Sequence, residues 1–106
     1  MAKYLLQVNY VGEGVKGLLK EGGTSRRAAA EKAVASVGGK IDAMYFAFGR
    51  YDAYVLCEVP DMASATAMAL TLNASGRVTC NTVPLITAEE VDQASKKSIT
   101  YRAPGA

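Results

Sequence analysis

Two residues in the middle of the chain could carry out acid–base chemistry. Asp52 stands in the segment FGRYDAY (48–54), beside a predicted turn between two apolar runs, and Tyr45 precedes that segment. A carboxylate facing a cleft can act as a general base, and a tyrosine hydroxyl can polarise a carbonyl. Asp52 and Tyr45 are therefore the candidate catalytic pair. The alternatives are a carboxylate that accepts hydrogen bonds from turn amides and a tyrosine that packs in the core or at an interface.

A second set of residues could hold a ligand. It comprises Arg26, Lys16, Tyr10, Tyr54 and Asn81. Arg26 follows Thr24 and Ser25, where a helix is predicted to start, so free amides and a guanidinium could together hold an anionic group. The tyrosines could stack on a planar ligand. The alternatives are solvated surface charge for Arg26 and Lys16 and ordinary packing for the tyrosines.

The chain contains no histidine, and its two cysteines are Cys57 and Cys80. Histidine is the usual acid–base residue, haem ligand and metal ligand, so its absence argues against haem and redox-metal chemistry. Two thiols alone cannot complete a tetrahedral zinc site. We expect buried free thiols, with a disulfide only if their strands are neighbours. We expect no cofactor, so any catalysis would depend on Asp, Glu, Tyr, Lys or Arg.

Length and composition predict one globular domain spanning residues 1–106. Of the 106 residues, 50% are apolar and 21% are charged, which is ordinary for a protein that folds around a core. The net charge is +2 and the basic residues are scattered among acids, which argues against nucleic-acid binding. No stretch approaches the roughly 18 apolar residues of a membrane span. The expected location is therefore the cytoplasm, without membrane contact.

The hydrophobic pattern predicts alternating strands and helices. Strands are predicted at 3–10, 40–48, 51–59 and 77–86, helices at 12–37, 62–75 and about 87–97, and an extended tail at 98–106. The first helix should be broken at Gly22 and Gly23. Asp61 should cap the second, and Thr87 with Glu90 should form a capping box on the third. The tail is expected to lie on this subunit or a neighbouring one.

The two middle strands are predicted to form a hairpin across Gly49 and Arg50. Gly49 would provide a positive backbone φ, and Phe48 would anchor the core. Simple alternation along 40–48 places Ile41, Ala43 and Tyr45 on one face of the strand.

The order of elements, βαββαβ, predicts a ferredoxin-like α+β fold with a four-stranded antiparallel sheet and two helices on one face. The other face would carry large apolar residues and polar ones together. These are Leu5, Tyr45, Tyr54 and Leu56 with Gln7, Asn9, Glu58, Thr79 and Asn81. An apolar surface of this extent usually marks an interface, so a face-to-face homodimer is expected. The polar residues then predict a water-filled or ligand-filled space between the sheets.

Several stretches along the chain resemble the GYD domain family. They are EGVKGLLKEGG (13–23), Arg26-Arg27, Gly38-Gly39, YFAFGRYDAY (45–54), VPD (59–61), TAEEVDQA (87–94) and YRAPG (101–105). The signature residues of that family appear as Gly49, Tyr51 and Asp52, with Arg50 between the glycine and the tyrosine. The resemblance covers essentially the whole chain. It implies the fold of the dimeric α+β barrel superfamily and a homodimer, and it implies no particular reaction.

Two functions are expected on this basis. The first is a homodimer that binds a small organic molecule in a cleft beside the sheet, as a cofactor-free enzyme of the monooxygenase or isomerase type. Asp52 and Tyr45 would be its acid–base pair and Arg26 its anion anchor. The alternative is a non-catalytic oligomeric module with a sensory or structural role. The sequence leaves open whether the protein is an enzyme, what it binds and whether dimers assemble further.

Overall fold

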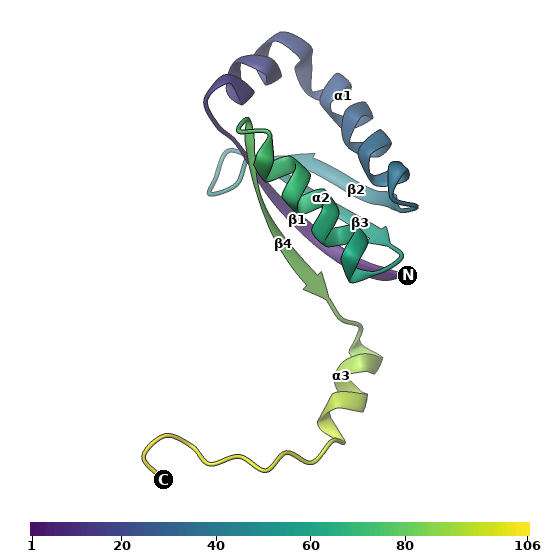
Figure 1. The fold of residues 1–106 in the computed structure, drawn as a ribbon, viewed down its shortest axis with the longest axis vertical. Helices are drawn as coiled ribbons and strands as arrows, with labels where there is room; N and C mark the ends of the chain where they lie inside the picture. Colours follow the sequence, from purple (N-terminus) through teal and green to yellow (C-terminus); the bar gives the residue numbers. More distant parts are fainter.

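The computed structural model describes all 106 residues as a four-stranded sheet, two helices packed on it and a C-terminal extension. The elements are β1 (Ala2–Tyr10), α1 (Glu13–Ser36), β2 (Lys40–Phe46), β3 (Ala53–Val59), α2 (Met62–Ala74), β4 (Val78–Leu85) and α3 (Ala88–Ser95). The sheet has the order β2-β3-β1-β4, and every neighbouring pair is antiparallel. Both α1 and α2 lie on one face of the sheet (Figure 1). This confirms the predicted ferredoxin-like βαββαβ fold.

The two central strands supply most of the core. Along β3, every second residue from Ala53 to Val59 is buried, and β1 buries Tyr4, Leu6 and Val8 in the same way. These side chains face α1 and α2, where Val34, Ala65 and Met68 are also buried. We call this side of the sheet the covered face and the other side the open face. Strict alternation in the sequence thus places apolar side chains under the helices.

The helix α1 consists of two segments joined at a kink. Gly22 has φ 82° and ψ 167°, which is not a helical conformation, and regular helix resumes after it. Glycine adopts a positive φ without the steric penalty that a Cβ atom imposes. The first segment also packs very closely on the loop before β4, because a Cβ atom on Gly14 would overlap the carbonyl oxygen of Arg77. The predicted break in this helix is confirmed.

The hairpin between β2 and β3 is wider than predicted. Its last strand pair is Phe46 with Ala53, and the amide of Ala47 donates to the carbonyl of Asp52 over 2.8 Å. Gly49 does not have a positive φ, and its position has no neighbouring atom that would exclude a Cβ. Phe48 is fully exposed at the tip. The expectations for Gly49 and Phe48 were therefore wrong, because both residues lie beyond the paired strands.

An irregularity in β2 changes which face its residues occupy. The pairing with β3 shifts between Ile41 and Ala43, so that Ile41 lies opposite Cys57 whereas Ala43 lies opposite Leu56. Ile41 consequently faces the helices and packs against the core, while Ala43 and Tyr45 lie on the open face. The prediction that all three share one face was wrong, because a bulge inserts one extra residue into the alternation.

The caps and the edge strand agree with the sequence pattern. The Asp61 carboxylate accepts a hydrogen bond from the amide of Ser64 over 2.8 Å at the start of α2. Pro84 lies in β4, which is an edge strand, where a missing amide donor is tolerated. At α3, the Thr87 hydroxyl accepts from the Glu90 amide and the Glu90 carboxylate accepts from the Thr87 amide. This is the predicted capping box.

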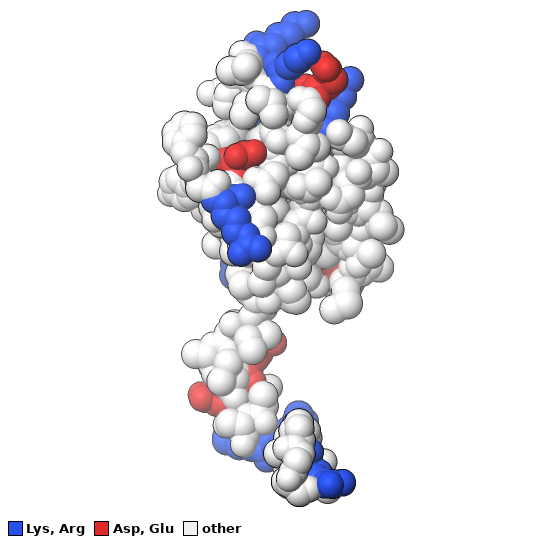
Figure 2. All heavy atoms as spheres, turned by 90° about the vertical axis from the view of Figure 1, so that its left-hand side faces the viewer, with Lys and Arg blue, Asp and Glu red and all other residues white.

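Residues 86–106, which we call the arm, extend away from the body of the domain (Figure 1). Every residue of the arm is exposed, including Ile86, Val91, Ile99 and Tyr101. Figure 2 shows acidic groups on α3 and basic groups further along the arm, separate from the charged groups at α1. The arm makes the molecule 55 Å long. None of the helices combines the length and apolar character that crossing a membrane requires.

Candidate functional site

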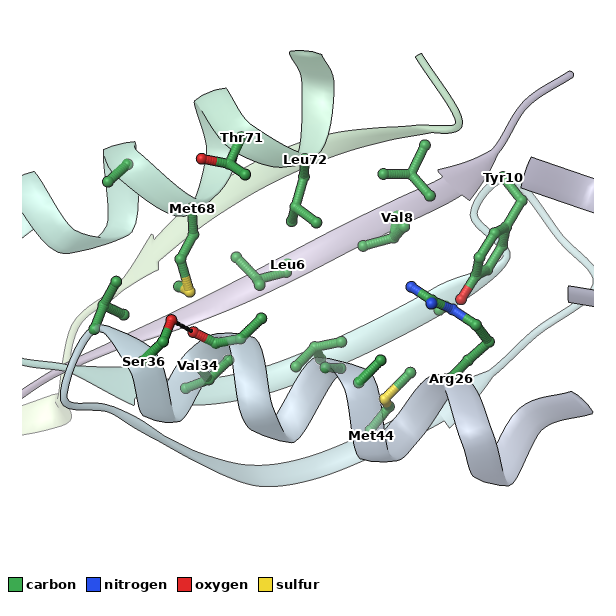
Figure 3. Close-up of a pocket in the computed structure, with 18 residues that line it drawn as sticks. Leu6, Val8, Tyr10, Arg26, Val34, Ser36, Met44, Met68, Thr71 and Leu72 are labelled. Carbon is green, nitrogen blue, oxygen red and sulfur yellow. Dashed lines mark hydrogen bonds between the residues drawn. The ribbon is translucent and has the colours of Figure 1, made fainter. Parts of the chain in front are cut away.

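An apolar cleft lies between the second segment of α1, the helix α2 and the covered face of the sheet (Figure 3). Its volume is about 210 Å³. Leu6 and Val8 of β1 form its floor, and Met68 and Leu72 of α2 line one wall (Figure 3). The cleft opens to solvent, since Ala29, Ala33 and Thr71 among its lining residues are exposed. Small-molecule sites are typically concave and mainly apolar in this way. A cleft of this size in so small a domain is therefore a candidate binding site.

Small side chains on α1 create the space. Ala29, Ala30 and Ala33 all line the cleft from the second segment of the helix. Alanine supports helix formation without projecting beyond its Cβ atom, so these positions hold the helix in place but leave room beneath it. A leucine at one of them would fill part of the volume. At these three positions, α1 therefore contributes only methyl groups to the cleft, whereas α2 contributes the larger side chains of Met68 and Leu72.

Arg26 and Tyr10 form the polar end of the cleft. Arg26 comes from α1, four residues after the kink at Gly22, and Tyr10 is the last residue of β1. Both are half-buried, and Figure 3 shows the guanidinium and the phenol hydroxyl at the same end of the cleft. The nearest anionic group to Arg26 is the Glu21 carboxylate, at 3.7 Å from Nη1. Arg26 is also the one charged residue that lines this cleft.

Asp52 lies outside the cleft and ties the hairpin to β1. Its carboxylate Oδ2 accepts a hydrogen bond from the amide of Tyr10 over 2.9 Å. Its own amide donates to the carbonyl of Val8 at 2.9 Å and to Oδ1 of Asn9 at 3.1 Å. These contacts are those expected of a carboxylate that satisfies backbone amides. They also fix the backbone of Tyr10, so Asp52 helps to position the residue that does line the cleft.

The other predicted site residues are distributed over two further surfaces. Tyr45 and Tyr54 lie opposite each other on the open face, and Tyr45 is 73% exposed. Asn81 is on the same face, where its amide nitrogen donates to Oε1 of Gln7 over 2.7 Å. Lys16 is exposed on the first segment of α1 and lies 3.4 Å from the Glu13 carboxylate. The structure therefore brings Arg26 and Tyr10 together, and it places Asp52 and Tyr45 apart from the cleft.

Ion pairs cross the open face at the end where the chain begins. The Lys3 ammonium lies 2.7 Å from the Asp42 carboxylate and 3.2 Å from that of Glu58, and Lys40 lies 3.4 Å from Glu58. The hydrogen bond from Lys3 lowers the pKa of Asp42, and Lys3 and Lys40 lower the pKa of Glu58. The Asp42 and Glu58 carboxylates raise the pKa of Lys3. Ion pairs thus occupy part of the open face, on which no helix packs.

The two cysteines are free thiols on strands that are not neighbours. Cys57 on β3 lies opposite Tyr4, and Cys80 on β4 lies opposite Val8, so β1 separates them. A disulfide between them is ruled out by this separation. Burial raises the pKa of Cys57 to about 11 and raises that of Cys80 as well. No group of three or more carboxylate or thiol side chains is arranged to hold a metal ion.

The cleft itself was missed by reasoning from the sequence. The polar residues of the open face suggested a space between two sheets, but the cleft of this chain lies on the opposite side, under the helices. The space is left by the alanines of α1, and in a sequence such a run indicates a helix with an apolar face rather than a cleft. Among the cleft residues, the sequence identified Arg26 and Tyr10, whereas Met44 and Thr71 received no role.

The sheet, the two helices on its covered face and the cleft between them define an α+β domain of the ferredoxin-like type. Within that class, the family model of the GYD domain matches residues 4–95 of the chain. The chain belongs to the GYD domain family, as its sequence resemblance indicated. No curated protein matches the chain.

Proposed function

We propose that this protein binds a small organic molecule in the cleft between α1, α2 and the sheet. The observation that carries the proposal is the cleft itself, about 210 Å³ of mainly apolar space with two polar groups at one end. Binding sites for small molecules commonly combine an apolar wall with a few polar groups that fix orientation. Arg26 and Tyr10 supply those groups here.

Binding is the function that the geometry supports best, ahead of catalysis. No carboxylate lines the cleft, and the candidate pair Asp52 and Tyr45 is located elsewhere. A cofactor-free reaction of the isomerase or monooxygenase type would have to rely on the Tyr10 hydroxyl and the Arg26 guanidinium. These groups could stabilise negative charge on a substrate oxygen.

We propose further that the protein acts as a homodimer joined through the open face. Leu5, Tyr54, Leu56 and Val83 are only half-buried there, although they lie side by side across three strands. Burying such a surface against a second copy would remove it from water. The exposed apolar residues of the arm favour the alternative function, a non-catalytic module whose role is assembly. The binding experiment below separates the two.

The cleft can be tested with 1-hexanol as a neutral probe and a substitution that fills the space. We expect 1-hexanol to shift the methyl NMR signals of Leu6, Val8 and Met68, because these groups line the cleft. In Ala33→Leu the shifts should be lost. The matched control is Ala35→Leu, on the same helix but outside the cleft, which should bind as wild type does.

Two results would count against the proposal. One is the absence of any methyl shift at millimolar 1-hexanol, which would favour the assembly module. The other is an equal response in Ala33→Leu and Ala35→Leu, which would place the binding outside the cleft.

A further inference from the structure

A second hollow adjoins the polar end of the cleft. It has a volume of about 270 Å³ and lies beneath the first segment of α1. It differs from the cleft in composition, since only 4 of its 12 lining residues are hydrophobic. Glu13, Glu21, Ser75 and Arg77 are among its polar residues. We call this second space the polar hollow after those residues, although most of its accessible surface is apolar, as it is in the cleft.

The boundary between the two hollows is lined by Thr71, Leu72 and Val78 as well as by Arg26 and Tyr10. The apolar body of Arg26 or of Tyr10 contributes to the wall, while its polar end is available to both spaces. Neither the Arg26 guanidinium nor the Tyr10 hydroxyl has a hydrogen-bond partner within the chain. The contact of Arg26 with Glu21 is an ion pair at 3.7 Å, longer than a charge-assisted hydrogen bond. The donors at the boundary are therefore free to receive a ligand.

The charges around the polar hollow favour an anion at this boundary. Of its two acidic residues, Glu13 lies 3.4 Å from Lys16, which does not line the hollow, so Glu21 is the one carboxylate near Arg26, at 3.7 Å. Arg77 lines the same hollow and takes part in no ion pair. A ligand ammonium group would meet the Arg26 guanidinium as a like charge. A carboxylate would meet a planar fork of N–H donors that matches its geometry.

We infer that the ligand of this protein is a small amphipathic carboxylate. Its apolar body lies in the cleft over Leu6 and Val8, and its carboxylate lies at the boundary, where it accepts hydrogen bonds from Arg26 and Tyr10. The polar hollow beyond holds the water, or a second polar group of the ligand, next to that carboxylate. This inference rests on the proposed function of the cleft and assigns the chemical class of its ligand.

The experiment compares hexanoate with 1-hexanol, which share an apolar chain and differ in the charged group. Wild-type protein should bind hexanoate about 10-fold to 100-fold more tightly, because hydrogen bonds to a charged group outweigh those between neutral groups. Affinities are measured by NMR titration of the Met44 and Met68 methyl signals. In Arg26→Gln the preference should disappear while 1-hexanol still binds. Tyr10→Phe should reduce the preference only several-fold.

The chain offers a matched control in the next residue. Arg27 is exposed and lines neither hollow, so Arg27→Gln removes the same charge without touching the boundary. The inference is overturned if Arg27→Gln lowers the preference as much as Arg26→Gln does, since general electrostatic attraction would then explain it. Equal affinities for the two probes in wild type, both lost in Ala33→Leu, would overturn the carboxylate assignment but leave the cleft as a binding site. Failure of both probes to bind would overturn both proposals.

Discussion

The two faces of the sheet solve the problem of burial in different ways. On the covered face, β1 presents Tyr4, Leu6 and Val8, all buried beneath the helices. On the open face, the same strand presents Lys3, Leu5 and Gln7, none of them fully buried. The side chains of β1 therefore alternate between the two faces. Within a single chain, only those on the covered face are buried.

Each face is incomplete at a different place. The covered face is closed by apolar packing except at the cleft, where alanines of α1 leave space. The open face uses ion pairs around Lys3 and the hydrogen bond between Gln7 and Asn81 to satisfy its polar groups, but it leaves Leu5 and Leu56 half-exposed. A cleft beside the core is the kind of space that a small ligand fills, whereas an uncovered apolar surface is the kind that another protein covers.

Leu5 and Leu6 provide a direct test of this comparison between the faces, because they are consecutive leucines on opposite faces of the sheet. We expect Leu6→Ala to lower the free energy of unfolding by about 2–5 kcal/mol, since it removes a buried side chain and leaves a cavity. In an isolated chain, Leu5→Ala should cost less than about 1.5 kcal/mol, because Leu5 is only half-buried. Urea denaturation monitored by circular dichroism measures both values.

The same pair of variants also reports on the proposed dimer. If the open face is an interface, the cost of Leu5→Ala should grow with protein concentration, and light scattering should show a larger monomer fraction than in wild type. Leu6→Ala provides the control, since its cost should not depend on the dimer contact itself. A monomeric wild type at micromolar concentration would contradict the dimer and leave the open face exposed to water.

A smaller effect is expected when acid titrates the ion pairs of the open face. The pKa values of Asp42 and Glu58 are lowered in the folded chain, so their stabilising contribution is complete above the unfolded pKa of about 4. That contribution is lost as the pH falls through the lowered folded values. Wild type should therefore lose more stability between pH 7 and pH 2 than Lys3→Met, because that variant lacks the ammonium group that pairs with both carboxylates.

The measurement for this prediction is the urea midpoint at each pH. Lys20→Met serves as the control because Lys20 takes part in no ion pair, and it should keep the acid sensitivity of wild type. An acid sensitivity in Lys3→Met equal to that of wild type would show that the ion pairs of Lys3 do not contribute to stability.

Elements with local sequence signals could be predicted well. Alternation identified β1 and β3, and the caps at Asp61 and Thr87 marked the starts of α2 and α3. Each of these signals acts over a few residues, so it survives in the folded structure. The bulge between Ile41 and Ala43 could not be predicted in this way, since it depends on how β2 pairs with β3, a strand that comes later in the chain.

The candidate site was predictable only in part, because residue types do not reveal which groups converge. Arg26 and Tyr10 were selected for their chemistry, and the fold places both at one end of the cleft. Asp52 was selected for its place at a turn, but its carboxylate is directed at the amide of Tyr10. The cleft results from missing atoms on α1, and an absence of side-chain volume has no distinct signature in a helix rich in alanine.

The smallest effect concerns one atom at the centre of the covered face, the thiol of Cys57. It is completely inaccessible, and burial raises its pKa from the ordinary value of 9.0 to about 11, so its thiolate fraction at pH 8 falls roughly 100-fold. Cys80, half-buried on the edge strand, is accessible by comparison.

Iodoacetamide should therefore modify native protein at Cys80 alone, as measured by intact mass and peptide mapping, while both thiols react in urea. Cys80→Ser should leave the native chain unmodified. Modification of native Cys57 at the rate of Cys80 would mean that the helices separate from the sheet often enough to admit the reagent, and the covered face would then be no better closed than the open one.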